Sequence, residues 1–208
     1  MTITTASKTR SSRRTALIAG ATVAMMALTI ALPRAEAQVI PPLVPANLEV
    51  PFGNTPFLVG HAYGTQNYMC LLMAGGFAWT FFGPQATLFN DDGQQLITHF
   101  LSANPDEYGT PRATWQESQD TSAVWAVAIA NSTDPAYVMP GAIPWLLLRV
   151  VGSEEGPTGG TSLSTTTFVQ RVNTRGGAAP AASGCARAAD IGRKALVPYT
   201  ADYVFYRN

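Results

Sequence analysis

The chain has 208 residues, of which 47% are hydrophobic and only 12% are charged, with 13 basic and 13 acidic side chains. Five of the basic residues but only one acidic residue fall within residues 1–37, so the remainder carries a formal charge of −4. A mildly acidic domain without a lysine or arginine cluster lacks the electrostatic basis of nucleic-acid binding. We therefore expect no nucleic-acid partner.

The first 37 residues have the pattern of a bacterial export signal. Basic residues between Lys8 and Arg14 precede an uncharged run over 15–32, and Ala35-Glu36-Ala37 has the form of a cleavage site. We predict a signal peptide over 1–37 and a periplasmic or secreted mature chain without membrane contact. The run of 18 residues could also span a bilayer, so an uncleaved anchor is the alternative. Arg13-Arg14 leaves the general and the twin-arginine export routes both open.

Cys70 and Cys185 are the only two cysteines. Because an oxidising compartment favours disulfides, we predict that they are joined. A bridge closing so long a loop contributes roughly 4 to 5 kcal/mol by chain entropy. The competing interpretation is a pair of reactive or metal-binding thiols, although no Cys-x-x-Cys spacing supports it.

The sequence predicts an all-β protein with one domain. Residues 38–56 hold five prolines and predict an extended Pro-rich arm, whereas 57–208 form a β-rich domain. About nine short strands indicate an antiparallel sandwich or a partly closed barrel. We expect a mobile loop or hairpin tip over 156–167 and at most a short helical turn near 187–191. The expected strands are 57–63, 67–74, 77–82, 86–90, 94–101, 123–130, 143–151, 164–172 and 199–206.

One joint between strands is especially clear. Asp92-Gly93 stands between two apolar runs and predicts a tight hairpin in which both residues take positive φ angles.

The two histidines, His61 and His99, each stand in an apolar strand. His61 shares a face with Val59 and Tyr63, and His99 shares one with Ile97, so we expect both rings to point inward. Each is then either a hydrogen-bonded core residue or a functional base. The functional interpretation gains support only if the two rings converge, although a mechanism with a single histidine would not need this.

The densest group of polar residues runs from Gly60 to Cys70. His61, Gln66 and Tyr68 supply a base, an amide and a phenol within this segment, while Gly60 and Gly64 allow a ligand or the backbone to approach closely. The segment could orient a small polar molecule. Alternatively, its side chains satisfy one another.

Two charged residues stand among apolar neighbours near the C-terminus. Asp202 lies between aromatic residues and is either a partner that orients a histidine or arginine, or an exposed strand charge. Arg171 needs a carboxylate partner, for which Asp202 and Glu117 are the candidates.

Several mechanisms lack their sequence signature. No nucleophile elbow, phosphate loop, dinucleotide fingerprint or zinc-protease helix is found. A metal site is conceivable only from His61 and His99 with an oxygen ligand, so we predict neither a metal site nor a cofactor.

The order of the segments resembles a known family. The residues that carry the resemblance are Gly60-His61-Ala62, Gln66, Tyr68, Cys70, Ala86-Thr87-Leu88, Asp92-Gly93, His99-Phe100, Trp115, Ile143 to Leu148, Gln170-Arg171-Val172, Thr174, Gly176-Gly177, Cys185 and Tyr199 to Tyr203. This set is similar to the secreted domain-of-unknown-function family 3455.

That resemblance implies an exported β-rich domain and no particular activity. The family pattern has Asp-Gly-Ser where this chain has Asp120-Thr121-Ser122, which puts a tight turn there in question. Some fungal members carry dehydrogenase labels, but nothing in this sequence could hold a dinucleotide.

Three functional hypotheses follow. The first is a binding module whose pocket, lined by aromatic residues such as Trp115 and Trp145, holds a small molecule oriented by His61, Gln66 and Tyr68. The second is a hydrolase or isomerase with His61 or His99 as base, Asp202 as its orienting partner and Tyr68 as acid. The third is a structural or surface protein that meets a partner through a sheet edge or the arm.

Overall fold

The structure is a computed structural model that describes residues 38–208 together with Met1, Thr2 and Thr4. The predicted signal peptide and its alternatives lie outside the described residues. In the described part of the chain, no helix has the length and apolarity needed to cross a membrane.

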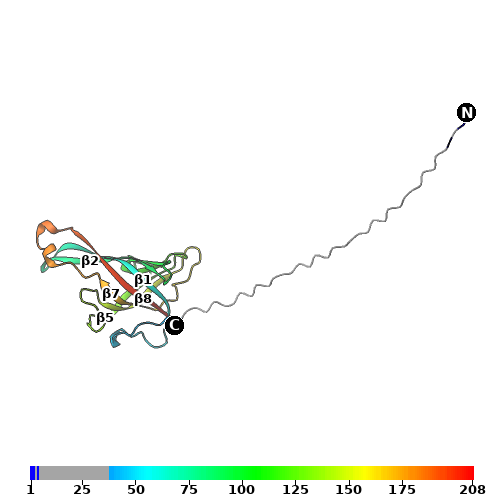
Figure 1. Cartoon of the computed structure of the whole chain (residues 1–208). Helices are drawn as coiled ribbons and strands as arrows, with labels where there is room; N and C mark the ends of the chain where they lie inside the picture. The colour runs from blue at the N-terminus through cyan, green and yellow to red at the C-terminus, as the bar shows by residue number, and fades with distance from the viewer. Residues whose placement is uncertain (3, 5–37) are drawn as a thin grey trace. The chain divides into compact units, whose positions relative to one another are not determined.

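The prediction of an all-β fold is confirmed, and the sheet closes on itself. Eight antiparallel strands each pair with the next in the sequence, and β8 pairs with β1 to complete a barrel (Figure 1). Full closure removes the exposed sheet edges on which neighbouring chains could add a strand. The strands are β1 Thr55–Met73, β2 Gly76–Phe89, β3 Gln95–Asn104, β4 Thr110–Glu117, β5 Ala123–Ser132, β6 Trp145–Glu154, β7 Phe168–Gly176 and β8 Lys194–Arg207.

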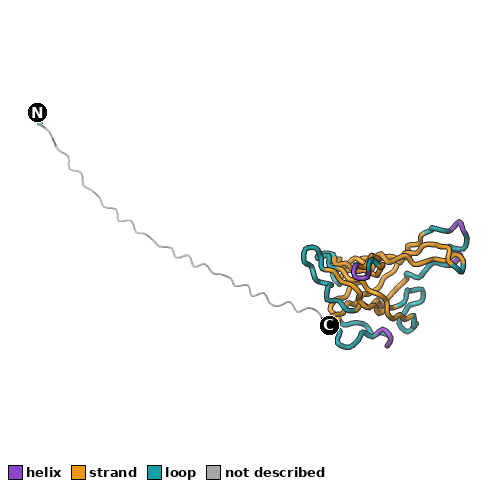
Figure 2. Tube along the Cα trace, turned by 180° about the vertical axis from the view of Figure 1, so that it is seen from behind, coloured by secondary structure: helices purple, strands orange, loops and turns teal. Residues whose placement is uncertain are grey.

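Helical structure is confined to four short 3₁₀ turns in the described part of the chain, seen in purple in Figure 2. They are η1 Ala46–Leu48, η2 Pro105–Glu107, η3 Ala182–Gly184 and η4 Ala188–Asp190. The predicted turn near 187–191 therefore corresponds to η4.

Several predicted strand boundaries were wrong. The expected strands 57–63 and 67–74 are one strand, β1, and the expected strands 77–82 and 86–90 are one strand, β2. Gly83 and Pro84 do not end β2. The register with β1 shifts by one residue between Asn67 and Tyr68, and this β-bulge, together with a φ of +150° at Gly83, lets the pairing continue past both residues. Strand β4 was not predicted, because Pro111 and its polar neighbours interrupt the alternation of apolar and polar residues that is typical of a strand.

The hairpin at Asn90–Gly93 is present, with a correction to its backbone. Only Gly93 has a positive φ, of +75°, and its N–H donates to the Asn90 carbonyl at 3.0 Å. The register then shifts by one residue between Leu88 and Phe89. The connection therefore combines a turn with a glycine bulge.

Two glycines in β1 allow β2 to approach closely. Gly60 is paired with Tyr203 and Gly64 with Tyr199 on β8. A Cβ on Gly60 would lie 2.8 Å from Leu88, and a Cβ on Gly64 would lie 2.6 Å from that of Ala86. Side chains at these positions would therefore collide with the wall of the neighbouring strand.

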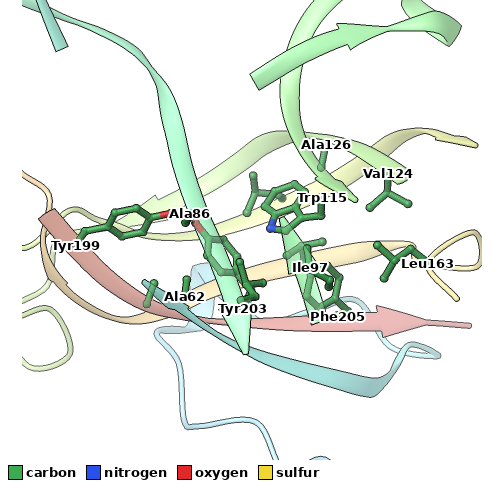
Figure 3. Packing of buried hydrophobic residues seen from close by; sticks show 14 of the residues in the cluster. Ala62, Ala86, Ile97, Trp115, Val124, Ala126, Leu163, Tyr199, Tyr203 and Phe205 are labelled. Carbon is green, nitrogen blue, oxygen red and sulfur yellow. Dashed lines mark hydrogen bonds between the residues drawn. The ribbon is translucent and has the colours of Figure 1, made fainter. Parts of the chain in front are cut away.

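One end of the barrel is closed by a packed apolar layer, which we call the closed end. Leu163 and Phe205 are fully buried there, and Trp115 meets Phe205 edge to face (Figure 3). The loop carrying Leu163 is fixed, because its N–H donates to Ser122 Oγ at 3.1 Å and Asp120 accepts from the Ser162 N–H at 2.8 Å. The segment 156–167 connects the paired antiparallel strands β6 and β7, in agreement with the hairpin alternative of the prediction.

The arm before β1 packs on the outside of the barrel. Leu48 is fully buried, and its carbonyl accepts a hydrogen bond from Gln170 Nε2 at 2.6 Å. This contact belongs to what we call the outer cluster, which consists of Leu48, Val138, Trp145, Leu147, Val172, Val204 and Tyr206. The barrel wall therefore carries apolar side chains on both of its faces.

The β1–β2 hairpin extends beyond the barrel and is fastened to the β7–β8 connection (Figure 1). The predicted disulfide between Cys70 and Cys185 is confirmed, with a Cα–Cα distance of 5.4 Å. Cys70 also exchanges backbone hydrogen bonds with Gly192 and Arg193, each of 2.9 Å. The alternative of two free thiols is excluded, and the disulfide fits an oxidising compartment.

Candidate functional site

Alternation along β1 separates the predicted site residues into two groups. Gln66, Tyr68 and Cys70 point into the barrel and are buried, whereas His61 and Tyr63 point outward, with 36% of the His61 side chain exposed. The expectation that His61 points inward was wrong. Because His99 is buried inside the barrel, the two histidines lie on opposite faces of the sheet and do not converge.

Of the three interior residues of β1, Gln66 lines a cavity of about 260 Å³, which we call the open-end cavity. It lies at the end of the barrel opposite Leu163 and Phe205, where β4 and β5 separate after their last pair, Ala113 with Ala126. Its lining residues are Gln66, Phe81, Pro84, His99, Leu101, Pro111, Arg112, Ala113, Trp115, Ala126, Val127, Ala128, Leu146, Leu148, Arg171 and Tyr203. Larger hollows of about 670, 610 and 540 Å³ follow the barrel surface but enclose no comparable set of buried donors.

Two N–H groups at this cavity have no hydrogen-bond partner. Gln66 is only 3% exposed and Trp115 is fully buried, yet neither Gln66 Nε2 nor Trp115 Nε1 reaches an acceptor in the described part of the chain. The Gln66 amide contacts the Tyr199 hydroxyl closely enough to oppose the rise in the pKa of that hydroxyl, but no hydrogen bond of standard geometry joins the two groups, and the Gln66 Cγ packs close to Gly177. A buried donor left without a partner costs about 1 to 3 kcal/mol, so two of them at one cavity need an explanation.

Arg171 brings a positive charge to the same cavity. Its expected carboxylate partner was wrong, because neither Asp202 nor Glu117 pairs with it. Instead, Nε and Nη2 donate to the Pro144 carbonyl, at 3.2 and 2.9 Å. Residues 38–208 thus provide no counter-ion for this guanidinium.

A second arginine at the cavity is fully paired. Arg112 donates from Nε and Nη2 to the two carboxylate oxygens of Glu107, at 2.7 and 2.8 Å. This guanidinium lowers the pKa of Glu107 to about 2. Of the two cavity arginines, only Arg171 has charge left for another partner, and sequence reasoning had singled out neither Arg112 nor Glu107.

His99 is held as a neutral ring. It stacks on Trp115 with 4.3 Å between ring centroids, and Nδ1 donates to the Thr114 carbonyl at 2.8 Å. Burial lowers the pKa of His99 to about 3, and this hydrogen bond only partly opposes the effect. Nε2 therefore carries a lone pair, but so weak a base takes up protons poorly, which favours an accepting role over general-base catalysis.

The interior tyrosines are protonated at neutral pH. Burial raises the pKa of Tyr199 and of Tyr203, whose hydroxyls lie 3.3 Å apart. Figure 3 shows Tyr203 between Tyr199 and Trp115. The Tyr68 hydroxyl donates to the Gly177 carbonyl at 2.7 Å and does not line the open-end cavity.

The exterior group is centred on His61. Its Nδ1 lies 2.7 Å from Asp202 Oδ1, and its Nε2 lies 2.9 Å from Asp91 Oδ1. Asn173 donates to the other Asp202 oxygen at 2.7 Å. The bond to Asp202, opposed by partial burial and assisted by Asp91, raises the pKa of His61. Asp202 is therefore the partner of a histidine.

The remaining predicted site residues do not come together. Trp145 lies in the outer cluster, where its ring meets that of Tyr137, and is separated from Trp115 by the barrel wall. Among residues 38–208, no group of three or more His, Cys, Asp or Glu side chains has metal-binding geometry. The weak proposal of a metal held by both histidines is contradicted by their positions.

The sequence model of one family, described as "Protein of unknown function (DUF3455)", matches residues 51–207. The chain belongs to the DUF3455 family. Comparisons with curated proteins and with solved structures gave no match.

The DUF3455 region contains all eight strands and every residue that lines the open-end cavity. The turn η1 and the buried Leu48 precede it. The cavity is thus built entirely from the region that matches the family, whereas part of the outer cluster is contributed by the preceding arm.

Proposed function

We propose that this protein binds a small molecule in the open-end cavity. The observation that carries the proposal is that two of the three buried side-chain N–H groups without a partner in the described residues, Gln66 Nε2 and Trp115 Nε1, belong to residues that line this one cavity, while the third, Trp145 Nε1, lies in the outer cluster. A ligand that accepts from both would remove a cost that the ligand-free protein bears.

The rest of the lining suits a ligand with an apolar body. Phe81, Leu146 and Leu148 supply apolar surface, while His99 and Trp115 form a stacked pair. Binding pockets commonly combine such surfaces with a few converging polar groups. The volume of about 260 Å³ restricts the ligand to a small one.

The four tryptophan indoles provide a direct test. Trp115 faces the cavity, Trp125 donates to Ser102 Oγ at 2.9 Å, Trp79 donates to the Ala181 carbonyl at 3.2 Å, and Trp145 lies in the outer cluster. In ¹⁵N-edited NMR spectra, we expect compounds from a panel of small alcohols, phenols, amides and acids to move the Trp115 indole signal, which a Trp115→Phe variant assigns. The other three signals are internal controls.

A bulky side chain introduced at the mouth of the cavity provides a second test. Ala128 is exposed and lines the cavity, whereas the next residue, Ile129, is 49% exposed and does not. We expect Ala128→Trp to abolish the shift and Ile129→Trp to preserve it. A panel that never moves the Trp115 signal, or that moves it equally in the Ala128→Trp variant, would overturn the proposal.

A second candidate function is supported by His61 alone. The 2.7 Å contact with Asp202 forms a histidine–carboxylate pair bordered by surface hollows of about 610 and 540 Å³. Because both ring nitrogens face carboxylates, the ring favours its protonated form and suits a general acid. His61→Asn should abolish any hydrolase or isomerase activity found in a substrate screen; undiminished activity would exclude this role.

A further inference from the structure

We infer that the ligand of the open-end cavity is a small monocarboxylate, whose carboxyl group is bound by Arg171 together with the free N–H groups of Gln66 and Trp115. This inference rests on the proposed function and adds the chemical class of the ligand.

The charge balance of the cavity supports an anion. Arg112 is neutralised by Glu107 through two hydrogen bonds, whereas Arg171 contacts only neutral oxygens in the described part of the chain, the Pro144 carbonyl and the Tyr203 hydroxyl. A half-buried guanidinium without a counter-ion is costly, and a carboxylate is the anion whose two oxygens match its planar donors. The single uncompensated positive charge favours one negative charge over the two of a phosphate monoester, since the second would remain unpaired.

The unpartnered groups are all donors. Gln66 Nε2 and Trp115 Nε1 offer hydrogen bonds and line the same cavity as Arg171. A carboxylate has about four acceptor positions and no donor, so it can engage all three side chains. A neutral alcohol or amide offers fewer acceptor positions and leaves the charge of Arg171 without a partner.

The size and lining of the cavity define the rest of the ligand. The volume of about 260 Å³ corresponds to about nine water molecules at ~30 Å³ each. A carboxylate with roughly nine non-hydrogen atoms therefore fits, and Phe81, Leu148 and the Trp115 ring favour an aromatic or aliphatic body. Long-chain fatty acids exceed this space.

Matched ligand pairs test the carboxylate directly in the unmodified protein. Dissociation constants are measured by calorimetry at pH 7 for benzoate against benzamide and for hexanoate against hexanamide. Because each pair differs mainly in charge, we expect the acid to bind about ten- to a hundredfold more tightly than its amide. This arm of the experiment needs no variant to fold.

Variants then assign the effect to Arg171. Arg171→Gln should bring the ratio of the two constants close to one, whereas Arg175→Gln should leave it unchanged, since Arg175 is exposed on the same strand and does not line the cavity. Amides that bind as tightly as acids, or a preference that survives Arg171→Gln, would overturn the carboxylate assignment and leave the binding function intact. Absence of binding by every compound, with no shift of the Trp115 indole, would overturn both.

Discussion

Two buried glutamines should respond in opposite ways to the same substitution. Gln66 is 3% exposed and Gln170 is 2% exposed. Gln170 is fully bonded, since Nε2 donates to the Leu48 carbonyl at 2.6 Å and Oε1 accepts from the Tyr206 hydroxyl at 2.5 Å. Gln66 Nε2 has no acceptor among the described residues. Substituting each glutamine by leucine therefore compares two free energies: what is gained by removing an unpartnered amide, and what is lost by removing a hydrogen-bonded one.

Gln66→Leu should stabilise the ligand-free protein. It removes a buried donor that costs about 1 to 3 kcal/mol, against which repacking beside Gly177 subtracts up to about 1 kcal/mol. We expect the free energy of unfolding to rise by up to about 3 kcal/mol. The variant should also lose ligand binding, because the amide is one of the groups that orient the ligand.

Gln170→Leu should destabilise the protein. It leaves the Leu48 carbonyl and the Tyr206 hydroxyl buried without a partner, at about 1 to 3 kcal/mol each. We expect a loss of about 2 to 5 kcal/mol.

Urea unfolding of ligand-free protein with the disulfide intact, followed by tryptophan fluorescence, measures both changes. If Gln66→Leu destabilised the protein by more than about 1 kcal/mol, its amide would be hydrogen-bonded in the free protein, with the Tyr199 hydroxyl as the nearest partner. The cavity would then lack one of the two unpartnered donors on which the proposed ligand binding depends.

Three further perturbations test other parts of the structure. Thr121 has a φ of +61°, so Thr121→Gly should raise the free energy of unfolding by about 0.5 to 1 kcal/mol, seen as a higher melting temperature; no increase would mean that the turn is unstrained. Replacing Cys70 and Cys185 by alanine should cost about 4 to 5 kcal/mol in urea unfolding, and a cost under ~1 kcal/mol would contradict the chain-entropy argument. The His61 pair with Asp202 raises the histidine pKa, so its stabilisation is complete below the unfolded value of about 6.5 and is lost as the pH rises through the higher folded value. The stability difference between wild type and His61→Asn should therefore shrink as the pH rises above ~6.5, and a difference that grows instead would reverse the sign of this coupling.

The strand pattern predicted the fold class and the inward face of β3, where His99 and Ile97 are buried, but not the inward face of β1. The sequence correctly grouped His61 with Val59 and Tyr63, yet this face is the outer one. The alternation of apolar and polar residues along a strand identifies the interior face only when the other face is polar. Here the arm buries Val59 and Val204 in the outer cluster, so both faces of β1 and β8 carry apolar residues. Only the long-range contact of Leu48 with the barrel resolves the ambiguity.

The sequence predicted some of the residues that line the candidate site, but it did not predict the hydrogen-bond partners of those residues. Gln66 and Trp115 were both expected to contact a ligand, and both line the cavity. The partner of Arg171 was wrong because a carboxylate was assumed to be available within the chain. Arg171 instead donates to the Pro144 carbonyl, a backbone atom that no sequence pattern marks, and contacts the neutral Tyr203 hydroxyl.

Apolar packing and the unpartnered polar groups of the proposed site differ in how they affect the stability of the barrel. At the closed end, Leu163 and Phe205 are fully buried, and hydrogen bonds fix the loop that covers them. At the other end, Gln66, Trp115 and Arg171 leave donors and a charge without partners. Unpartnered groups of this kind reduce stability by about 1 to 3 kcal/mol each, so a barrel that only had to fold would be better served by apolar residues at these positions. The core cluster that includes Leu163, Phe205 and the Trp115 ring supplies the stability that offsets this cost, and a ligand that supplies the missing acceptors would recover the cost as binding energy.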